Sequence, residues 1–378
     1  MSVQSFQIDI AQAQLDDLEW RLRQTRWAAT LPGDAWQKGS APDELKALVD
    51  YWLHQYDWRQ QERELNQLGH YYWRQDEMQI HFVHQRGNGP DPLPLLLTHG
   101  WPDSFLRYQK IIPLLTDPAR FGGKAEDAFD VIVPSLPGFA FSACPPGGVN
   151  NAQIADLWAQ LMTELGYPRF AASGGDIGSG VTRYLAVQHP DRLVGIHLTD
   201  IGLVRPLMQA TGADLTDEAR DYQAAAMKWI TQEGAYMTLQ STKPQTLAFA
   251  LNDSPVGLAS WILEKFHSWG DCQGNVFGRF SKDELLNNIM LYWLTASFGT
   301  SANLYYENSH SLPPMAKITV PTGLTRFPYD LMPPPRHWAE QNLAIRHWHE
   351  LPRGGHFTAM EEPELLAQEI RAFYQPLR

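Results

Sequence analysis

The spacing of apolar side chains changes along the chain and divides it into four regions. Residues 1–77 show helical spacing and predict an N-terminal helical meander that wraps the core after it. In 78–204, short apolar runs alternate with amphipathic helices, which indicates the strands of a buried sheet. Residues 205–312 show helical spacing alone, and strand–helix alternation returns in 313–378. Because such alternation forms parallel sheets, the pattern predicts an α/β fold with a mostly parallel, doubly wound sheet and a helical insertion.

Seven short runs are the expected strands of this sheet. They are residues 78–83, 93–98, 129–133, 170–172, 193–198, 318–325 and 345–348. The insertion contains three expected helices, one around 219–231, one opened by Ser254 and one opened by Ser281. Ser281 and Glu284 have the spacing of a capping box, in which each side chain satisfies an amide at the helix start. The insertion is therefore well placed to cover the strand ends.

The strand at 170–172 leads into a glycine-rich turn that is followed by a helical pattern. Strand, tight turn and helix are the context of the G-x-S-x-G elbow, which presents a nucleophile. Gly174 and Gly178 stand at the required spacing, and Asp176 stands where that motif has serine. A carboxylate is ionised near neutral pH and can attack a saturated carbon to form an ester of the enzyme. A glycine-rich turn that contains an aspartate without a catalytic role would have the same sequence. Residues elsewhere in the chain are therefore needed to distinguish a catalytic elbow from a structural turn.

Three further polar segments follow expected strands at the same edge of the sheet. His99-Gly100-Trp101-Pro102 follows 93–98, Asp330 follows 318–325 and His356 follows 345–348. Catalytic groups of doubly wound sheets gather beyond these strand ends, and the order nucleophile, acid, histidine is that of the α/β-hydrolase fold. We therefore expect His356 to reach Asp176 while Asp330 holds its other ring nitrogen. Each residue alone could be structural, but their common placement favours catalysis.

Composition narrows the class of partner. The net charge of −12 argues against nucleic acid and anionic membranes. Two cysteines, Cys144 and Cys272, provide neither a disulfide framework nor metal-ligand spacing, which is typical of a reducing compartment. No signal peptide and no apolar run of about 18 residues is visible. We expect a cytoplasmic protein that uses no cofactor and no metal.

Over almost its full length the sequence resembles the microsomal-type epoxide hydrolases. The matching segments are Phe6-Gln7-Ile8, 15–18, Thr25-Arg26-Trp27, 99–102, 111–118, Pro137-Gly138-Phe139, Gly174-Gly175-Asp176, 251–258, 353–357 and 361–366. The resemblance implies an α/β-hydrolase fold with an N-terminal meander and a helical cap. It also implies that a small epoxide is the substrate, and the many aromatic residues make an apolar epoxide the expectation.

The resemblance implies roles for five side chains. Asp176 would be the nucleophile, His356 the base and Asp330 the acid of the triad. Two cap tyrosines, Tyr236 and Tyr305, would donate hydrogen bonds to the epoxide oxygen. Ring opening needs such donors because it creates an alkoxide, and phenols with an ordinary pKa of about 10 stay protonated at neutral pH.

Some assignments stay open at the level of sequence. Tyr306 and Tyr292 compete with Tyr305, and the sequence does not decide between Tyr305 and Tyr306. The backbone amides of Trp101 and Ile177 are placed to form an oxyanion hole for the ester's tetrahedral intermediate.

Three residues and one segment depart from the family pattern. Ile177 replaces the frequent tryptophan after the nucleophile, which removes an aromatic ring from the pocket wall. Asp103 replaces the usual glycine and is expected to perturb its turn, and Asp330 stands where many relatives have glutamate. The membrane anchor of the mammalian enzymes is absent, which implies a soluble relative.

The expected function is therefore the hydrolysis of an epoxide to a vicinal diol. A dehalogenase with the same Asp–His pair is the alternative, but it needs a donor for the departing halide, and Ile177 offers none. An esterase or peptidase is less favoured because the elbow lacks serine. A non-enzymatic small-molecule binding protein would be favoured by a missing triad residue, and none is missing. The natural substrate, selectivity, oligomeric state and biological role, whether detoxification, catabolism or biosynthesis, are not encoded in these patterns.

Overall fold

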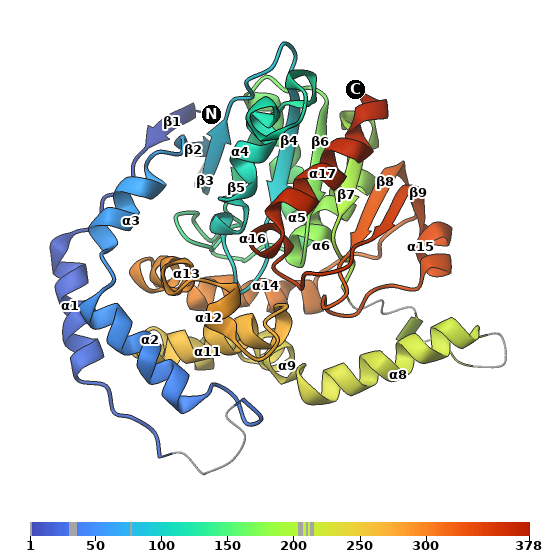
Figure 1. Ribbon diagram of the computed structural model, residues 1–378. Helices are drawn as coiled ribbons and strands as arrows, with labels where there is room; N and C mark the ends of the chain where they lie inside the picture. The colour runs from blue at the N-terminus through green and yellow to red at the C-terminus, as the bar shows by residue number, and fades with distance from the viewer. Residues whose placement is uncertain (1, 30–35, 76–77, 203–206, 209–210, 212–214) are drawn as a thin grey trace.

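Within the described residues, a twisted sheet of nine strands forms the centre of the fold (Figure 1). The structure is a computed structural model that describes residues 2–29, 36–75, 78–202, 207–208, 211 and 215–378. The strands run in the order β1-β2-β3-β5-β4-β6-β7-β8-β9. They are β1 (Ser2–Phe6), β2 (His70–Gln75), β3 (Met78–Gln85), β4 (Leu93–Thr98), β5 (Phe129–Pro134), β6 (Phe170–Gly174), β7 (Leu193–Leu198), β8 (Ile318–Arg326) and β9 (Leu343–Glu350).

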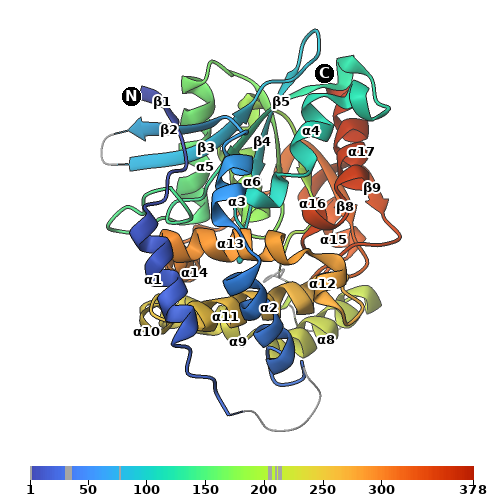
Figure 2. The ribbon, with the colours of Figure 1, turned by 60° about the vertical axis from the view of Figure 1, so that its left-hand side comes forward.

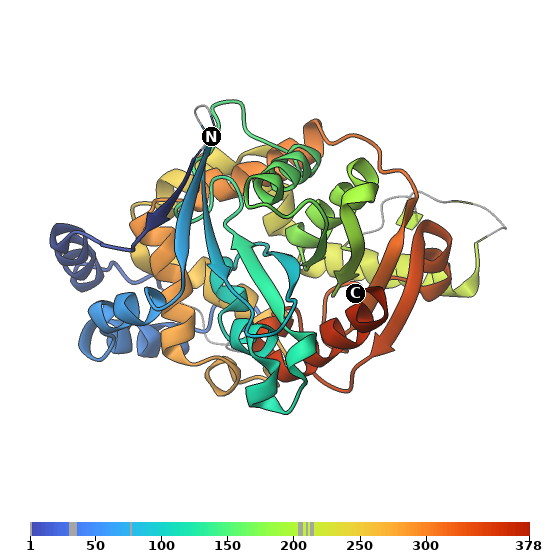
Figure 3. The same cartoon turned by 90° about the horizontal axis from the view of Figure 1, so that it is seen from above.

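The part of the sheet from β5 to β9 is parallel, and this confirms the predicted fold class. Strands β5, β6 and β7 are buried along their whole length. Helices cover both faces of the sheet, as the view from above shows (Figure 3). These are α5 (Asn151–Glu164) and α6 (Ile177–Gln188) on one face and α4 (Ile111–Thr116) and α17 (Pro363–Tyr374) on the other. Burial on both faces explains why these strands read as continuous apolar runs.

The predicted helical character of the N-terminal region holds except in two segments, which form strands. Helices α1 (Gln12–Arg23), α2 (Pro42–His54) and α3 (Trp58–Leu65) are present, but β1 and β2 are strands that extend the sheet antiparallel to β3. Strand β1 is almost fully exposed, so pairing rather than burial forms it and no apolar pattern marks it. In β2, aromatic residues on both faces hide the alternation expected of a strand.

The predicted helical insertion lies between β7 and β8. Its helices are α8 (Asp217–Gln232), α9 (Ala235–Thr242), α10 (Pro244–Leu251), α11 (Pro255–Trp269), α12 (Val276–Arg279), α13 (Lys282–Leu294) and α14 (Phe298–His310). They lie across the end of the sheet where the parallel strands terminate (Figures 1 and 2). The three expected helices are present, with Ser254 as an N-cap and Ser281–Glu284 as a capping box. The predicted boundary at 204/205 lies outside the described residues.

The N-terminal helices are attached to this insertion as well as to the core. Helices α1 and α2 pack against α11, and α2 also packs against α13 (Figure 2). The Tyr51 hydroxyl donates to Asp283 Oδ1 at 2.8 Å, and the Tyr56 hydroxyl donates to Asn287 Oδ1 at 2.6 Å. These contacts attach the insertion to the N-terminal segment. No helix in the described ranges combines the length and apolar character that a membrane crossing requires.

Removing the Tyr56 hydroxyl tests this attachment. Asn287 is buried, so Tyr56→Phe leaves its carbonyl oxygen without a donor, and we expect a loss of about 1–3 kcal/mol in unfolding free energy. Tyr51→Phe is the matched control, because Asp283 is not buried and water can replace the hydroxyl. Thermal unfolding followed by circular dichroism measures both. Equal effects of the two substitutions would contradict a specific role of the buried bond.

Candidate active site

The predicted elbow is present between β6 and α6. Asp176 has φ 56° and ψ −128°, a conformation that residues with a side chain rarely adopt. The flanking glycines are required by close packing. A Cβ on Gly178 would lie 1.9 Å from the carbonyl oxygen of Thr98, and one on Gly174 would lie 2.3 Å from that of Gly178. The turn therefore presents Asp176 at the carboxyl end of the sheet on a strained backbone.

The two carboxylate oxygens of Asp176 have different surroundings. The Trp101 amide donates to Oδ1 at 2.7 Å, whereas Oδ2 lies 3.6 Å from Nε2 of His356. Of the two predicted amides, Trp101 and Ile177, only that of Trp101 is hydrogen-bonded to Asp176 in the part of the chain that the structure describes. A Cβ on Gly100 would lie 2.2 Å from Oδ1, so this position must be glycine for the carboxylate to fit. One oxygen is thus fixed by the backbone and the other faces the imidazole.

His356 connects the elbow to the predicted acid. Its Nδ1–H donates to Asp330 Oδ1 at 2.7 Å, and its backbone amide donates to the carbonyl oxygen of Trp269 at 2.8 Å. The ring is only 2% exposed. Burial acts to lower the pKa of His356, but the charge of Asp330, the nearby carboxylate of Asp176 and the hydrogen bond to Asp330 outweigh it and raise the pKa to about 10. The imidazole is therefore protonated at neutral pH while Asp176 is charged.

Tyr236 of α9 and Tyr305 of α14 face the elbow from the helical insertion. The Tyr236 ring stacks on Trp101 at 5.3 Å between centroids, and Tyr305 meets Trp101 edge-on at 5.9 Å. Burial raises the pKa of both phenols, as does the charge of Asp176. Both hydroxyls therefore keep their protons at neutral pH. Asp176, His356 and the two tyrosines line a common cavity of about 210 Å³.

The geometry separates Tyr305 from the two competing tyrosines. Tyr306 is 37% exposed and stacks on the ring of His310 at 4.0 Å, away from the cavity lining. Tyr292 is buried, and its hydroxyl donates to the carbonyl oxygen of Asp103 at 2.8 Å. Only Tyr305 of the three lines the cavity that contains Asp176.

Apart from the charged and polar groups described above, the wall of this cavity is mostly apolar. Its apolar residues include Ile177, Trp229, Met237, Leu331 and Met332. Ile177, the residue after Asp176, thus forms part of this wall.

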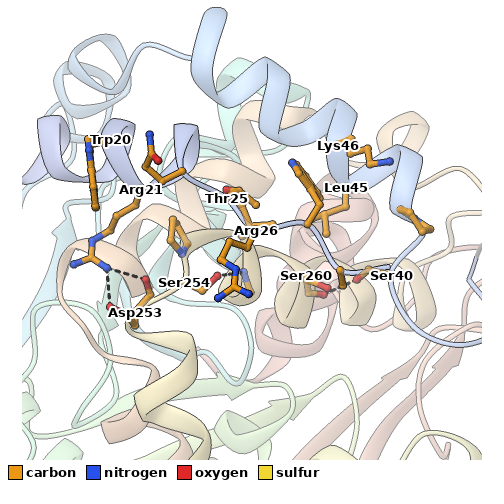
Figure 4. Close-up of a pocket in the computed structure, with 17 residues that line it drawn as sticks. Trp20, Arg21, Thr25, Arg26, Ser40, Leu45, Lys46, Asp253, Ser254 and Ser260 are labelled. Carbon is orange, nitrogen blue, oxygen red and sulfur yellow. Dashed lines mark hydrogen bonds and ion pairs between the residues drawn. The ribbon is translucent and has the colours of Figure 1, made fainter. Parts of the chain in front are cut away.

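A second and larger cavity, of about 540 Å³, lies outside the candidate site, between α1, α2 and the start of α11. Trp20, Arg21, Arg26 and Lys46 line it (Figure 4). It contains none of the predicted catalytic residues, so cavity size does not identify the site.

Asp103 does not open the turn that it was expected to perturb. Its Oδ1 accepts from the Gly100 amide at 2.9 Å, and its Oδ2 pairs with Arg107. Both side chains are buried, and Arg107 also donates to the carbonyl oxygen of His356 at 2.6 Å. Burial acts to raise the pKa of Asp103, but the Arg107 charge overrides it and lowers that pKa. The pair joins the turn that carries Trp101 to the loop that carries His356.

The sequence prediction also missed Asp200. It lies two residues beyond β7, is 4% exposed, and its Oδ2 accepts from the Asp176 amide at 2.6 Å. Burial, followed by the charge of Asp330, raises the pKa of Asp200 to about 6. The rule that located Asp330 and His356, polar residues just beyond strand ends, applies equally to Asp200.

Among the residues that the structure describes, two clusters contain three groups with the spacing to hold a metal ion. One is Asp200, Asp330 and His356, and the other is His347, His349 and Glu369. In the second cluster, both imidazoles are hydrogen-bonded to Glu369, at 2.6 and 2.8 Å. In the first, Asp330 is bonded to His356 and Asp200 to the Asp176 amide. These hydrogen bonds explain both arrangements without an ion.

The sheet, its elbow and the residues at the strand ends define the class of α/β hydrolases. Residues 94–363 match the family model described as alpha/beta hydrolase fold, and residues 3–108 match the model described as Epoxide hydrolase N terminus. The N-terminal match covers the very segment that attaches to the helical insertion.

Individual proteins agree with these matches. A protein of Stigmatella aurantiaca, provisionally named an epoxide hydrolase, is 46% identical over 375 residues, covering 99% of this chain and 85% of that protein. Epoxide hydrolase 1 of Oryctolagus cuniculus is 36% identical, covering 98% of this chain and 88% of that protein. The solved structure of Aspergillus niger epoxide hydrolase has a TM-score of 0.87 at 31% identity and covers 100% of this chain and 97% of that one. The chain belongs to the epoxide hydrolase family of α/β hydrolases, which confirms the resemblance seen in the sequence.

The close approach of Gly100 to the elbow gives a test of the geometry. In Gly100→Ala the new methyl group displaces the Asp176 carboxylate, and we expect at least a hundredfold loss in the hydrolysis of styrene oxide, on the order seen for comparable misplacement of reacting groups. Gly147→Ala is the control, because its Cβ meets nothing within 4 Å. Diol formation and thermal unfolding are measured together. Wild-type activity in a folded Gly100→Ala protein would contradict the assigned position of the carboxylate.

Proposed function

We propose that the protein hydrolyses an apolar epoxide to a vicinal diol through an ester of Asp176. The observation that carries the proposal is the asymmetric environment of this carboxylate. Oδ1 is fixed by the Trp101 amide, while Oδ2 is left to attack and lies beside His356. Two protonated phenols share the cavity with it. The apolar wall of the cavity supports an apolar substrate.

The first step forms the ester. Oδ2 of Asp176 attacks a ring carbon, a C–O bond of the epoxide breaks, and the negative charge passes to the epoxide oxygen. Hydrogen bonds from Tyr236 and Tyr305 stabilise this alkoxide, and it takes a proton through a phenol. The raised phenol pKa values support the donor role, because the hydroxyls are protonated before the reaction.

Ester formation also prepares the base for the second step. In the resting enzyme the Asp176 charge helps to keep His356 protonated. Once Asp176 is a neutral ester, that interaction is lost, the pKa of His356 falls, and its proton can replace the one that a phenol gave to the alkoxide. The imidazole is then neutral when a base is needed.

The second step hydrolyses the ester. His356 takes a proton from water, and the hydroxide attacks the Asp176 carbonyl carbon. The resulting oxyanion is stabilised by the Trp101 amide, with that of Ile177 next to it. The acyl C–O bond then breaks, the diol leaves with a proton from His356, and Asp176 returns to the carboxylate as His356 is reprotonated. Asp330 holds the ring in place throughout.

The remaining assignments follow from the same proposal. Residues 205–312 act as the cap, residues 1–77 act as a meander that supports it, and 78–204 with 313–378 form the catalytic core. The two cysteines, Cys144 and Cys272, are unpaired, which supports a cytoplasmic location.

A dehalogenase that uses the same Asp–His pair is the second candidate. Buried indole N–H groups of Trp101, Trp229 and Trp269 have no hydrogen-bond partner among the described residues, and Trp229 lines the cavity. Such donors could hold a departing halide. The two phenols favour the epoxide, because an alkoxide needs a proton and a halide does not.

His356→Ala separates the two steps of the proposal. Since His356 acts as a base only in the second step, the variant should still be alkylated by styrene oxide and should accumulate one adduct on Asp176, visible by intact and peptide mass spectrometry. Asp176→Asn is the control and should stay unmodified, as should His356→Ala incubated with a haloalkane of similar size. An unmodified His356→Ala protein, or an adduct on another residue, would count against the mechanism. An adduct from the haloalkane alone would favour the dehalogenase.

A further inference from the structure

Asp200 is a buried carboxylate that the proposed mechanism does not use. It lies beyond β7, next to the elbow, and both of its oxygens accept from backbone amides. Oδ2 accepts from Asp176 at 2.6 Å and Oδ1 accepts from Gly202 at 3.1 Å. These bonds fix the side chain relative to the nucleophile. Because the bond from Asp176 uses the backbone amide, it can persist when the side chain becomes an ester.

The same carboxylate lies close to the imidazole. One oxygen of Asp200, one oxygen of Asp330 and one ring nitrogen of His356 all lie within 4.8 Å of one another. His356 is thus approached by three carboxylates, with Asp330 at 2.7 Å and Asp176 at 3.6 Å. The charged groups that act on Asp200 or are acted on by it are Asp176, Asp330, His356, Arg107 and Arg183.

Packing alone does not account for this third carboxylate. Like charges at this separation repel, and burial opposes ionisation, so the charge of Asp200 has a cost that an uncharged acceptor of the same two amides would not have. Asp330 Oδ2 and His356 Nε2 are also buried without a hydrogen-bond partner in the described residues. Asp330 therefore holds the His356 ring through a single hydrogen bond, from Nδ1–H to Oδ1. A second carboxylate near the ring can add to the negative charge that stabilises an imidazolium.

We propose that Asp200 is a second acid partner of His356, whose charge stabilises the imidazolium formed when His356 takes a proton from water. This inference rests on the proposed ester mechanism. Asp200 acts in the second step. Asp176 is then a neutral ester, and the negative charge around the His356 ring comes from Asp330 and Asp200. Asp200 acts through His356 and is a positioning residue.

The titration of Asp200 agrees with this timing. Burial, followed by the charge of Asp330, raises its pKa to about 6; the charge of Asp176 also raises it, whereas the positive charge of His356 lowers it. In the ester both Asp176 and His356 are uncharged. When His356 then takes a proton from water, its positive charge lowers the pKa of Asp200 without the opposing charge of the Asp176 carboxylate. The ionised form of Asp200 is therefore favoured as the imidazolium forms.

Asp200→Asn removes the charge but keeps an oxygen that can accept from the Asp176 amide. Rapid quenching with mass spectrometry follows both steps with styrene oxide. We expect alkylation of Asp176 within about threefold of wild type, and ester hydrolysis slowed about tenfold at its plateau, the equivalent of one pKa unit. The acidic limb of the pH–rate profile for ester hydrolysis should move to lower pH, because the loss of a negative neighbour lowers the pKa of His356. Asp191→Asn, at an exposed position just before β7, is the control and should change neither rate nor limb.

Asp330→Asn supplies the second arm of the experiment. If Asp200 is a partner of His356, Asp330→Asn should retain slow ester hydrolysis, and the double variant Asp330→Asn/Asp200→Asn should lose at least a further tenfold. In the Asp176→Asn background, where the nucleophile is neutral as in the ester, NMR titration of the His356 ring should give a lower pKa when Asp200→Asn is added. Should Asp200→Asn fail to fold, Asp200→Ser, with a hydroxyl acceptor, takes its place throughout.

The outcomes distinguish the two levels of the account. Normal hydrolysis with an unshifted acid limb in folded Asp200→Asn overturns the role of Asp200 and leaves the ester mechanism intact. A slower hydrolysis without any shift of the limb or of the ring pKa also overturns it, because a purely structural loss has that result. Absence of an adduct on Asp176 in every variant overturns the proposed function itself.

Discussion

The position of the Asp176 carboxylate, between the Trp101 amide and the ring of His356, constrains much of the surrounding sequence. The elbow reaches it only with φ of 56° at a residue that has a side chain, a strain on the order of 1–3 kcal/mol. Gly100 and Gly178 are glycines because a Cβ at either position would overlap with the elbow or with β4. The hydrogen bond from the Asp176 amide to Asp200 offsets part of the strain. The active site and the local fold are thus one arrangement.

The same position couples the charges of Asp176 and His356. While Asp176 is ionised, His356 has a pKa of about 10 and is an imidazolium. In the proposed cycle, alkylation removes one negative charge and lets one proton leave the imidazole, so the net charge of the buried site stays constant. The buried Asp103–Arg107 pair fixes the two loops on which this coupling depends, because Arg107 binds the carbonyl oxygen of His356. In the same proposed cycle, Tyr236 and Tyr305 of the helical insertion supply the proton for the alkoxide.

Much of the fold could be predicted because its strands are buried on both faces. Buried strands such as β5 and β7 are visible in the sequence as continuous apolar runs. The exposed edge strand β1 has no such pattern, so the sequence did not predict it. The elbow could be located because its glycines are required sterically. The selection of Tyr305 over Tyr306 depends on how α14 is rotated relative to the cavity, which tertiary packing decides. Asp200 belongs to no motif, although its place after a strand end was readable.

The origin of the oxygen atoms tests the covalent mechanism most directly. A single turnover of styrene oxide with excess enzyme in ¹⁸O-water is followed by mass spectrometry of the diol and of the peptide that contains Asp176. Because the second diol oxygen comes from Oδ2 of Asp176 and water attacks the ester carbonyl, the account predicts label in Asp176 and an unlabelled diol. A labelled diol with an unlabelled Asp176 would show direct attack of water on the epoxide and would contradict the account.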